Sequence, residues 1–139
     1  MTLKPPHETF VRTDAELTQL WEHMMGSGGF ARHSIWHIFF DADGQMCPVI
    51  IPIDDIPLEP DPNVLDNLAD IVGEITRASA IASVAVLFSR PGEQAMTAAD
   101  RRWARAIHAA FASTIRLWPV HLATTDRIQI FAPDDLIAA

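Results

Sequence analysis

One stretch of the sequence decides the fold, Val84-Ala-Val-Leu-Phe-Ser-Arg-Pro-Gly-Glu-Gln-Ala-Met-Thr-Ala-Ala-Asp100. It continues an apolar run that starts at Ala80 and hardly alternates with polar residues, which is typical of a central strand covered on both faces. Its end, Thr97-Ala-Ala-Asp100, fits a capping box, in which two side chains bond free N–H groups at the start of a helix. The stretch therefore predicts a buried strand, a polar loop and a helix.

Apolar spacing and helix caps predict the elements on either side. The helix after residue 97 has an inward stripe of Trp103, Ile107, Ala110 and Phe111, and two strands follow it, 115–122 and 127–131. Before the stretch we expect a helix at about 14–25, a β-hairpin of strands 34–40 and 46–51, and a helix at about 63–79. Pro48 has no N–H to donate, so its strand should lie at an edge or carry a bulge. The order α-β-β-α-β-α-β-β predicts a three-layer α/β fold with a mixed central sheet flanked by helices.

Composition and charge limit the kinds of partner. The 139 residues fit a single domain, 1–139, with 49% hydrophobic and 20% charged residues. A net charge of −8, with no basic run, argues against nucleic acid as a partner. The lone Cys47 suits the reducing cytoplasm. We find neither a signal peptide nor an apolar run of about 18 residues, so we expect a cytoplasmic protein without a membrane partner.

From about residue 34 to 137 the chain resembles the RadC-type branch of the JAB/MPN metalloprotease-like fold. The resemblance rests on the turn Asp41-Ala-Asp-Gly44, on the apolar strand that ends at Phe88, and on the helix start Thr97-Ala-Ala-Asp100. It implies that fold, whose order of elements is also cytidine-deaminase-like, and a bacterial protein.

The resemblance also implies the positions of a zinc site, and here that site is degenerate. The family motif is His-x-His-x7-Ser-x2-Asp with an upstream Glu, and its positions fall in turn on Phe88, Arg90, Thr97, Asp100 and, for the Glu, Ile50 or Ile51. A catalytic zinc ion needs three protein ligands, and neither phenylalanine nor a protonated arginine can be one. Without the Glu there is also no general base. We therefore expect no metal, no cofactor and no zinc hydrolase activity.

The function that follows is non-catalytic. We expect a protein-binding or scaffold module whose partner is another protein or a second copy of the chain. The alternative is a small-ligand or anion-binding protein, or an enzyme, that reuses the same loop without zinc, because a loop that enters a helix start offers free N–H groups to an anion. The candidate residues of this loop are Ser89, Arg90, Glu93, Thr97 and Asp100.

The remaining candidates are expected to be structural. No Gly-x-Ser-x-Gly surrounds Ser89, and Cys47 should be a small core residue. His33 and His37 face the same side of a strand but lie too far apart to share an ion alone. Whether His33, His37 or His121 contributes to a site stays open. The four tryptophans are expected in the core, and the charges on the helices at 63–79 and after 97 are expected on solvated faces.

Overall fold

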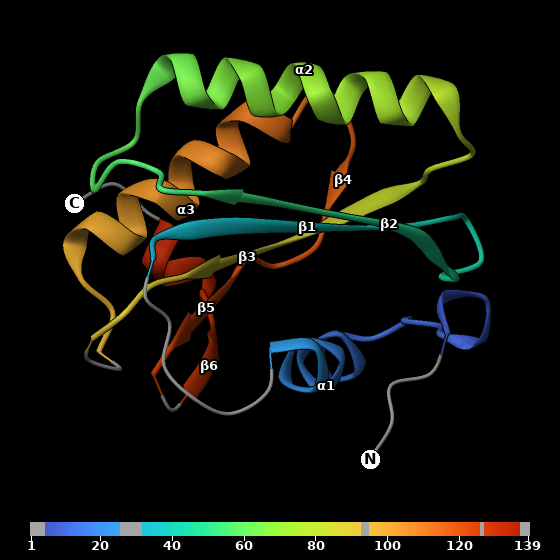
Figure 1. Ribbon diagram of the computed structural model, residues 1–139, viewed down its shortest axis with the longest axis horizontal. Coiled ribbons are helices and arrows are strands. Elements are labelled where there is room, and N and C mark those ends of the chain that lie inside the picture. The colour runs from blue at the N-terminus through green and yellow to red at the C-terminus, as the bar shows by residue number, and fades with distance from the viewer. Residues whose placement is uncertain (1–4, 26–31, 93–94, 126, 137–139) are drawn as a thin grey trace.

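The computed structural model describes residues 5–25, 32–92, 95–125 and 127–136. In these parts of the chain, six strands form one mixed sheet in the order β2-β1-β3-β5-β6, with β4 paired to β3 (Figure 1). The expected α/β fold with a mixed central sheet is confirmed. The helices and strands are α1 (Asp14–Met25), β1 (Ser34–Phe40), β2 (Met46–Asp54), α2 (Pro62–Ala78), β3 (Ser83–Ser89), α3 (Ala98–Phe111), β4 (Arg116–Leu117), β5 (His121–Thr124) and β6 (Arg127–Ile130), with short 3-10 turns at Pro6–Glu8 and Pro133–Leu136.

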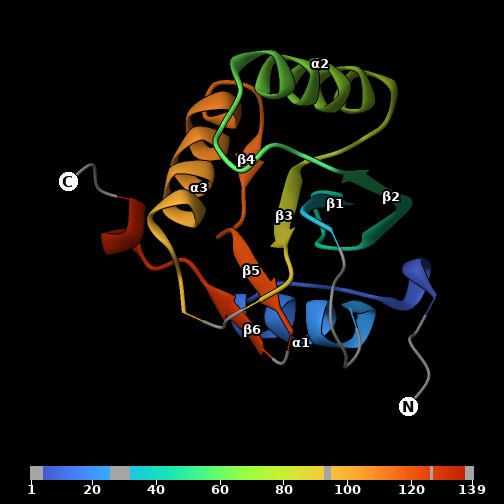
Figure 2. The same cartoon turned by 60° about the vertical axis from the view of Figure 1, so that its left-hand side comes forward.

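Helices cover both faces of the sheet, which gives three layers. Helices α2 and α3 lie on one face and α1 lies on the other (Figures 1 and 2). The α2/α3 side encloses the larger core cluster, which includes Trp103 and Phe111, and the α1 side encloses a second cluster around Trp21. Within the described parts of the chain, no helix has the length and apolarity needed to cross a membrane.

Strand β3 is the centre of the sheet, as the apolar run predicts. It pairs antiparallel with β1 and parallel with β4 and β5, and all seven of its residues are buried. Successive side chains of a strand point to opposite faces. Val84 and Phe88 accordingly pack under α2 and α3, whereas Ala85 and Leu87 pack towards α1.

The strand expected at 115–122 is wrong in one respect, because it is divided into β4 and β5. Val84 pairs with Leu117 and Leu87 pairs with His121, so three residues of the later strand lie opposite two of β3. This is one extra residue, as in a β-bulge. The interruption contains Pro119, which has no N–H for the ladder.

The hairpin confirms the prediction for Pro48 in both forms. Strand β2 is an edge of the sheet, and its register with β1 shifts across Pro48, since Ile38 pairs with Ile50 but Phe40 pairs with Met46. In the turn, Gly44 has a φ of 85°, and a Cβ atom there would lie 2.6 Å from the carbonyl oxygen of Val11. Glycine thus lets the segment before α1 lie directly on the hairpin.

Candidate functional site

The loop between β3 and α3 is closed by a buried ion pair. The guanidinium of Arg90 donates from Nε to Asp100 Oδ1 at 2.9 Å and from Nη2 to Asp100 Oδ2 at 2.8 Å. The two residues are 8% and 3% exposed. This two-bond arrangement is the strongest that arginine makes with a carboxylate, so it fixes the end of β3 to the start of α3.

Arg90 also holds the backbone of the loop. Its Nη1 donates to the carbonyl of Pro91 at 3.2 Å, its Nη2 donates to the carbonyl of Ala95 at 3.0 Å, and its own backbone N–H donates to the carbonyl of Ala123 on β5. The donors of the guanidinium are therefore directed at protein acceptors rather than at a ligand.

Asp100 is fully engaged as well. Its Oδ2 accepts from the backbone N–H of Thr97 at 2.9 Å, and the Thr97 hydroxyl accepts from the backbone N–H of Asp100, which completes the predicted capping box. Burial alone would raise the pKa of the Asp100 carboxyl. The hydrogen bonds and charge of Arg90, with the bonds to Thr97, outweigh burial and hold this pKa below its usual value.

Phe88 and Ser89 point to opposite sides of the sheet. Phe88 is 3% exposed, and its ring centroid lies 5.4 Å from that of Trp103 on α3. The Ser89 hydroxyl accepts from the indole N–H of Trp36 at 3.0 Å, on the side of the sheet that faces α1. Phe88 therefore packs in the core, and Ser89 has no basic partner among the described residues that would make it a nucleophile.

From the set of candidate residues the structure brings together Arg90, Thr97 and Asp100, and it places Ser89 towards the other face of the sheet. The two positions matched to the upstream Glu do not lie beside Phe88, because Phe88 pairs with Ile35, and Ile35 pairs with Ile53. Ile50 and Ile51 are further along β2. Glu93 lies outside the described residues.

The side chains at this loop do not fit a zinc ion. Both oxygens of Asp100 accept hydrogen bonds from Arg90, and a cationic guanidinium stands where the family motif has a second histidine. Throughout the described residues, no three His, Cys, Asp or Glu side chains are grouped closely enough to hold a metal ion.

The three histidines left open by the sequence lie in separate places. His33 is half-buried before β1. His37 is 1% exposed under α2 and α3, with Nδ1 3.0 Å from the carbonyl oxygen of Ile51. Among the described residues, no hydrogen-bond partner lies at its Nε2. His121 lies on the other face, where its Nε2 is 2.7 Å from the hydroxyl of Thr18 on α1.

The sequence predicts that the charged side chains of α3 lie on a solvated face, but two of them form ion pairs with other segments. Arg101 pairs with Asp135 at 3.2 Å, and Arg102 pairs with Glu59 in the loop before α2.

The tryptophans behave as expected: Trp21, Trp103 and Trp118 are buried, and Trp36 is half-buried. Cys47 is half-buried on β2 against the core.

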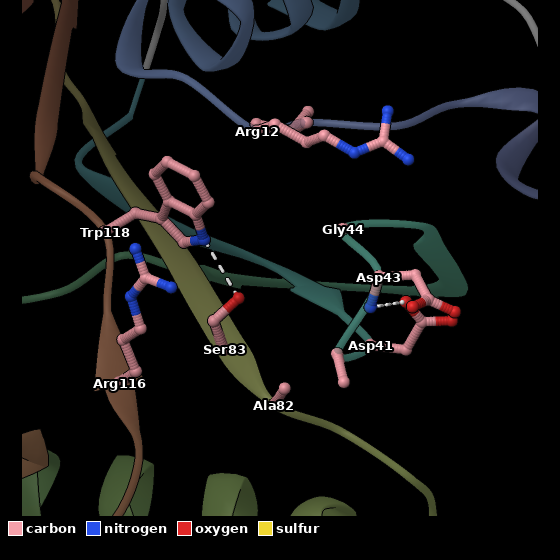
Figure 3. A pocket seen from close by; sticks show the side chains of 10 residues that line it. Arg12, Asp41, Asp43, Gly44, Ala82, Ser83, Arg116 and Trp118 are labelled. Carbon is pink, nitrogen blue, oxygen red and sulfur yellow. Dashed lines mark hydrogen bonds between the residues drawn. The ribbon is translucent and has the colours of Figure 1, made fainter.

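The structure also contains a pocket that the sequence does not predict. It has a volume of about 400 Å³ and lies at the start of β3, the end opposite to the Arg90 loop. Figure 3 shows side chains from several segments around it, among them Arg12, Asp41, Ser83 and Trp118. The turn Asp41-Ala-Asp-Gly44 is a recognisable motif, but the other walls come from segments far from it in the sequence, so no local signal brings the pocket together. Comparison of the sequence with protein-family models and with curated proteins gives no match.

Proposed function

We propose that the chain is a non-catalytic domain of the RadC-like JAB type, which acts by binding another protein or a second copy of itself. The buried pair of Arg90 and Asp100 carries this proposal. Of the positions matched to the zinc ligands, Asp100 is the one that has a carboxylate, and the ion pair uses this carboxylate to hold the start of α3. The order of elements and the capping box at Thr97 support the resemblance.

The alternative, a ligand site built on the Ser89-Arg90 loop, has less support. An anion would need donors that are free to turn towards it. The guanidinium donors of Arg90 are directed at Asp100 and at two backbone carbonyls, and Ser89 is 2% exposed beneath Trp36. Binding there would first have to break a buried ion pair, which is costly.

Strand β2 is the surface that best suits a protein partner. It is an edge strand, and its eight residues from Met46 to Ile53 include no charged side chain. Val49 and Ile50 are 39% and 43% exposed. Pro48 and Pro52 remove two N–H donors from this edge, which hinders pairing with a foreign strand. A partner would therefore meet apolar side chains rather than extend the sheet. The lone cysteine supports a cytoplasmic location.

Metal content and hydrolase activity test the non-catalytic part of the proposal. The full chain, purified without chelators, should contain far less than one zinc ion per molecule, and it should not hydrolyse isopeptide or peptide substrates when zinc is added. The variant Asp100→Asn is the matched control, because it would lose any zinc that Asp100 holds. Stoichiometric zinc and hydrolysis in the wild type, both lost in the variant, would overturn the proposal.

A further inference from the structure

The pocket at the start of β3 has the dimensions of a small-ligand site. Its volume, about 400 Å³, falls within the range of roughly 300–1,000 Å³ found for ligand pockets. Its walls come from the segment before α1, from the turn between β1 and β2, from the start of β3 and from β4 (Figure 3). The close approach of Gly44 to Val11 fixes two of these walls to each other.

The pocket is lined by two positive and two negative side chains, Arg12, Arg116, Asp41 and Asp43. None of the four takes part in an ion pair with another residue that the structure describes. Arg90, Arg101 and Arg102, in contrast, all have carboxylate partners. The pocket thus combines charges of both signs that have no counterion among the described residues.

The positive side of the pocket is held in position. The guanidinium carbon of Arg116 lies 5.1 Å from the ring centroid of Trp118, which is itself fixed by a bond from its indole N–H to the Ser83 hydroxyl and by an edge contact with Phe40. Such stacking leaves the N–H groups at the edge of the guanidinium able to donate. Ser83 is 5% exposed, and because its oxygen accepts from the indole, its own hydrogen can point elsewhere.

The negative side lies across the pocket, on the hairpin turn (Figure 3). Asp41 Oδ1 accepts from the backbone N–H groups of Asp43 and Gln45, at 2.9 and 3.0 Å. These bonds hold the carboxylate in one place and use only one of its two oxygens. In Figure 3 the carboxylate groups of both aspartates point outward from the turn, so a cationic group would meet them at the rim of the pocket.

We propose that this pocket binds a small zwitterion: an amino acid with a basic side chain, or a short peptide of the same charge pattern. The carboxylate of the ligand lies against Arg116 and Ser83, its cationic group lies against Asp41 and Asp43, and its stem lies along Trp118 and Ala82. A simple anion such as phosphate fits less well, since the two aspartates repel it. This site is independent of the Arg90 loop and of the proposed contact at β2.

Three related probes test the proposal by calorimetry at low ionic strength. L-arginine carries a carboxylate and a cationic side chain. L-citrulline has nearly the same shape and keeps the α-ammonium and carboxylate, but its side chain is uncharged, and agmatine lacks the carboxylate. We expect L-arginine to bind about tenfold more tightly than either of the others, because each lacks one charge-assisted hydrogen bond. No measurable binding of L-arginine, or equal binding of all three, would overturn the proposal, as would tighter binding of phosphate.

Variants then locate the site. Arg116→Gln should weaken L-arginine about tenfold and leave agmatine unchanged, whereas Asp43→Asn should weaken L-arginine and leave citrulline unchanged. Both side chains are exposed, so the fold should tolerate the changes, and unfolding temperatures verify this. Arg77→Gln, which removes an exposed arginine from α2, is the matched control. If Arg77→Gln weakens L-arginine as much as Arg116→Gln does, the effect is one of net charge and the proposed site is wrong.

Discussion

Arg90 and Asp100 show what a buried ion pair does at the scale of single residues. Removing two charges from water is costly, and their attraction roughly compensates only when every donor and acceptor is satisfied. Here each donor of Arg90 named above has an oxygen partner, and Asp100 also caps α3. The pair therefore specifies the path of the loop more than it adds stability.

The variant Asp100→Ala should lower the free energy of unfolding by about 3–5 kcal/mol, because it leaves the guanidinium of Arg90 buried without its counterion. The double variant Arg90→Met/Asp100→Leu should lose much less, about 1 kcal/mol for the lost cap, since neither charge remains inside. Urea unfolding of the two variants beside the wild type measures both values. An equal loss in the single and the double variant would show that the pair does not act as a unit.

At the scale of elements, α1 is joined to the sheet through His121. Burial, opposed by the bond to the carbonyl of Pro119 and by the charge of Asp14, lowers the pKa of His121 from 6.5 to about 4. The Pro119 carbonyl can only accept, so Nδ1 of the neutral ring carries the hydrogen. Nε2 is then an acceptor, and it faces the Thr18 hydroxyl, which also lies 3.1 Å from the Asp14 carbonyl. The helix is thus held to β5 by an uncharged imidazole.

This contact predicts a loss of stability in mild acid. Between pH 6.5 and about 4 the unfolded chain protonates His121 while the folded chain does not, so the unfolded state binds more protons and stability falls as the pH falls. The full effect is roughly 3 kcal/mol, at about 1.4 kcal/mol for each unit of pKa. Burial also lowers the pKa of His37, so the measurement is a difference between the wild type and His121→Gln in urea at pH 7 and pH 4.5. A constant difference across this range would contradict the prediction.

Elements and site differ in how far the sequence predicts them. The helices and the central strand carry local signals, such as the capping box at Thr97 and the unbroken apolar run of β3, and both are confirmed. The partner of Arg90 lies ten positions further along the chain, and the pocket depends on Arg12, Asp41 and Arg116 meeting from separate segments. Such contacts follow from tertiary structure and leave no periodic pattern in the chain.

For the whole molecule, the net charge opposes self-association, whereas the edge strand β2 favours it. A charge of −8 on 139 residues makes copies of the chain repel one another over distances set by ionic strength. Strand β2 offers the opposite, with exposed Val49 and Ile50 and no charge from Met46 to Ile53. Apolar contact is short-ranged and insensitive to dilute salt, so the balance between the two should change with salt concentration.

Self-association through β2 should therefore strengthen when salt is added. The distance over which charges act falls from roughly 30 Å at 0.01 M to about 10 Å at 0.1 M salt, which removes the repulsion and leaves the apolar contact. Sedimentation velocity over a series of protein concentrations should show more dimer at 0.1 M than at 0.01 M salt. Ile50→Asp should abolish the dimer at both, whereas Ile130→Asp, a change of the same kind at a similarly exposed residue of β6, should not. Dimers that weaken with salt would instead point to an interface of ion pairs. A monomer under every condition would contradict self-association, and the partner of β2 would then have to be a different protein.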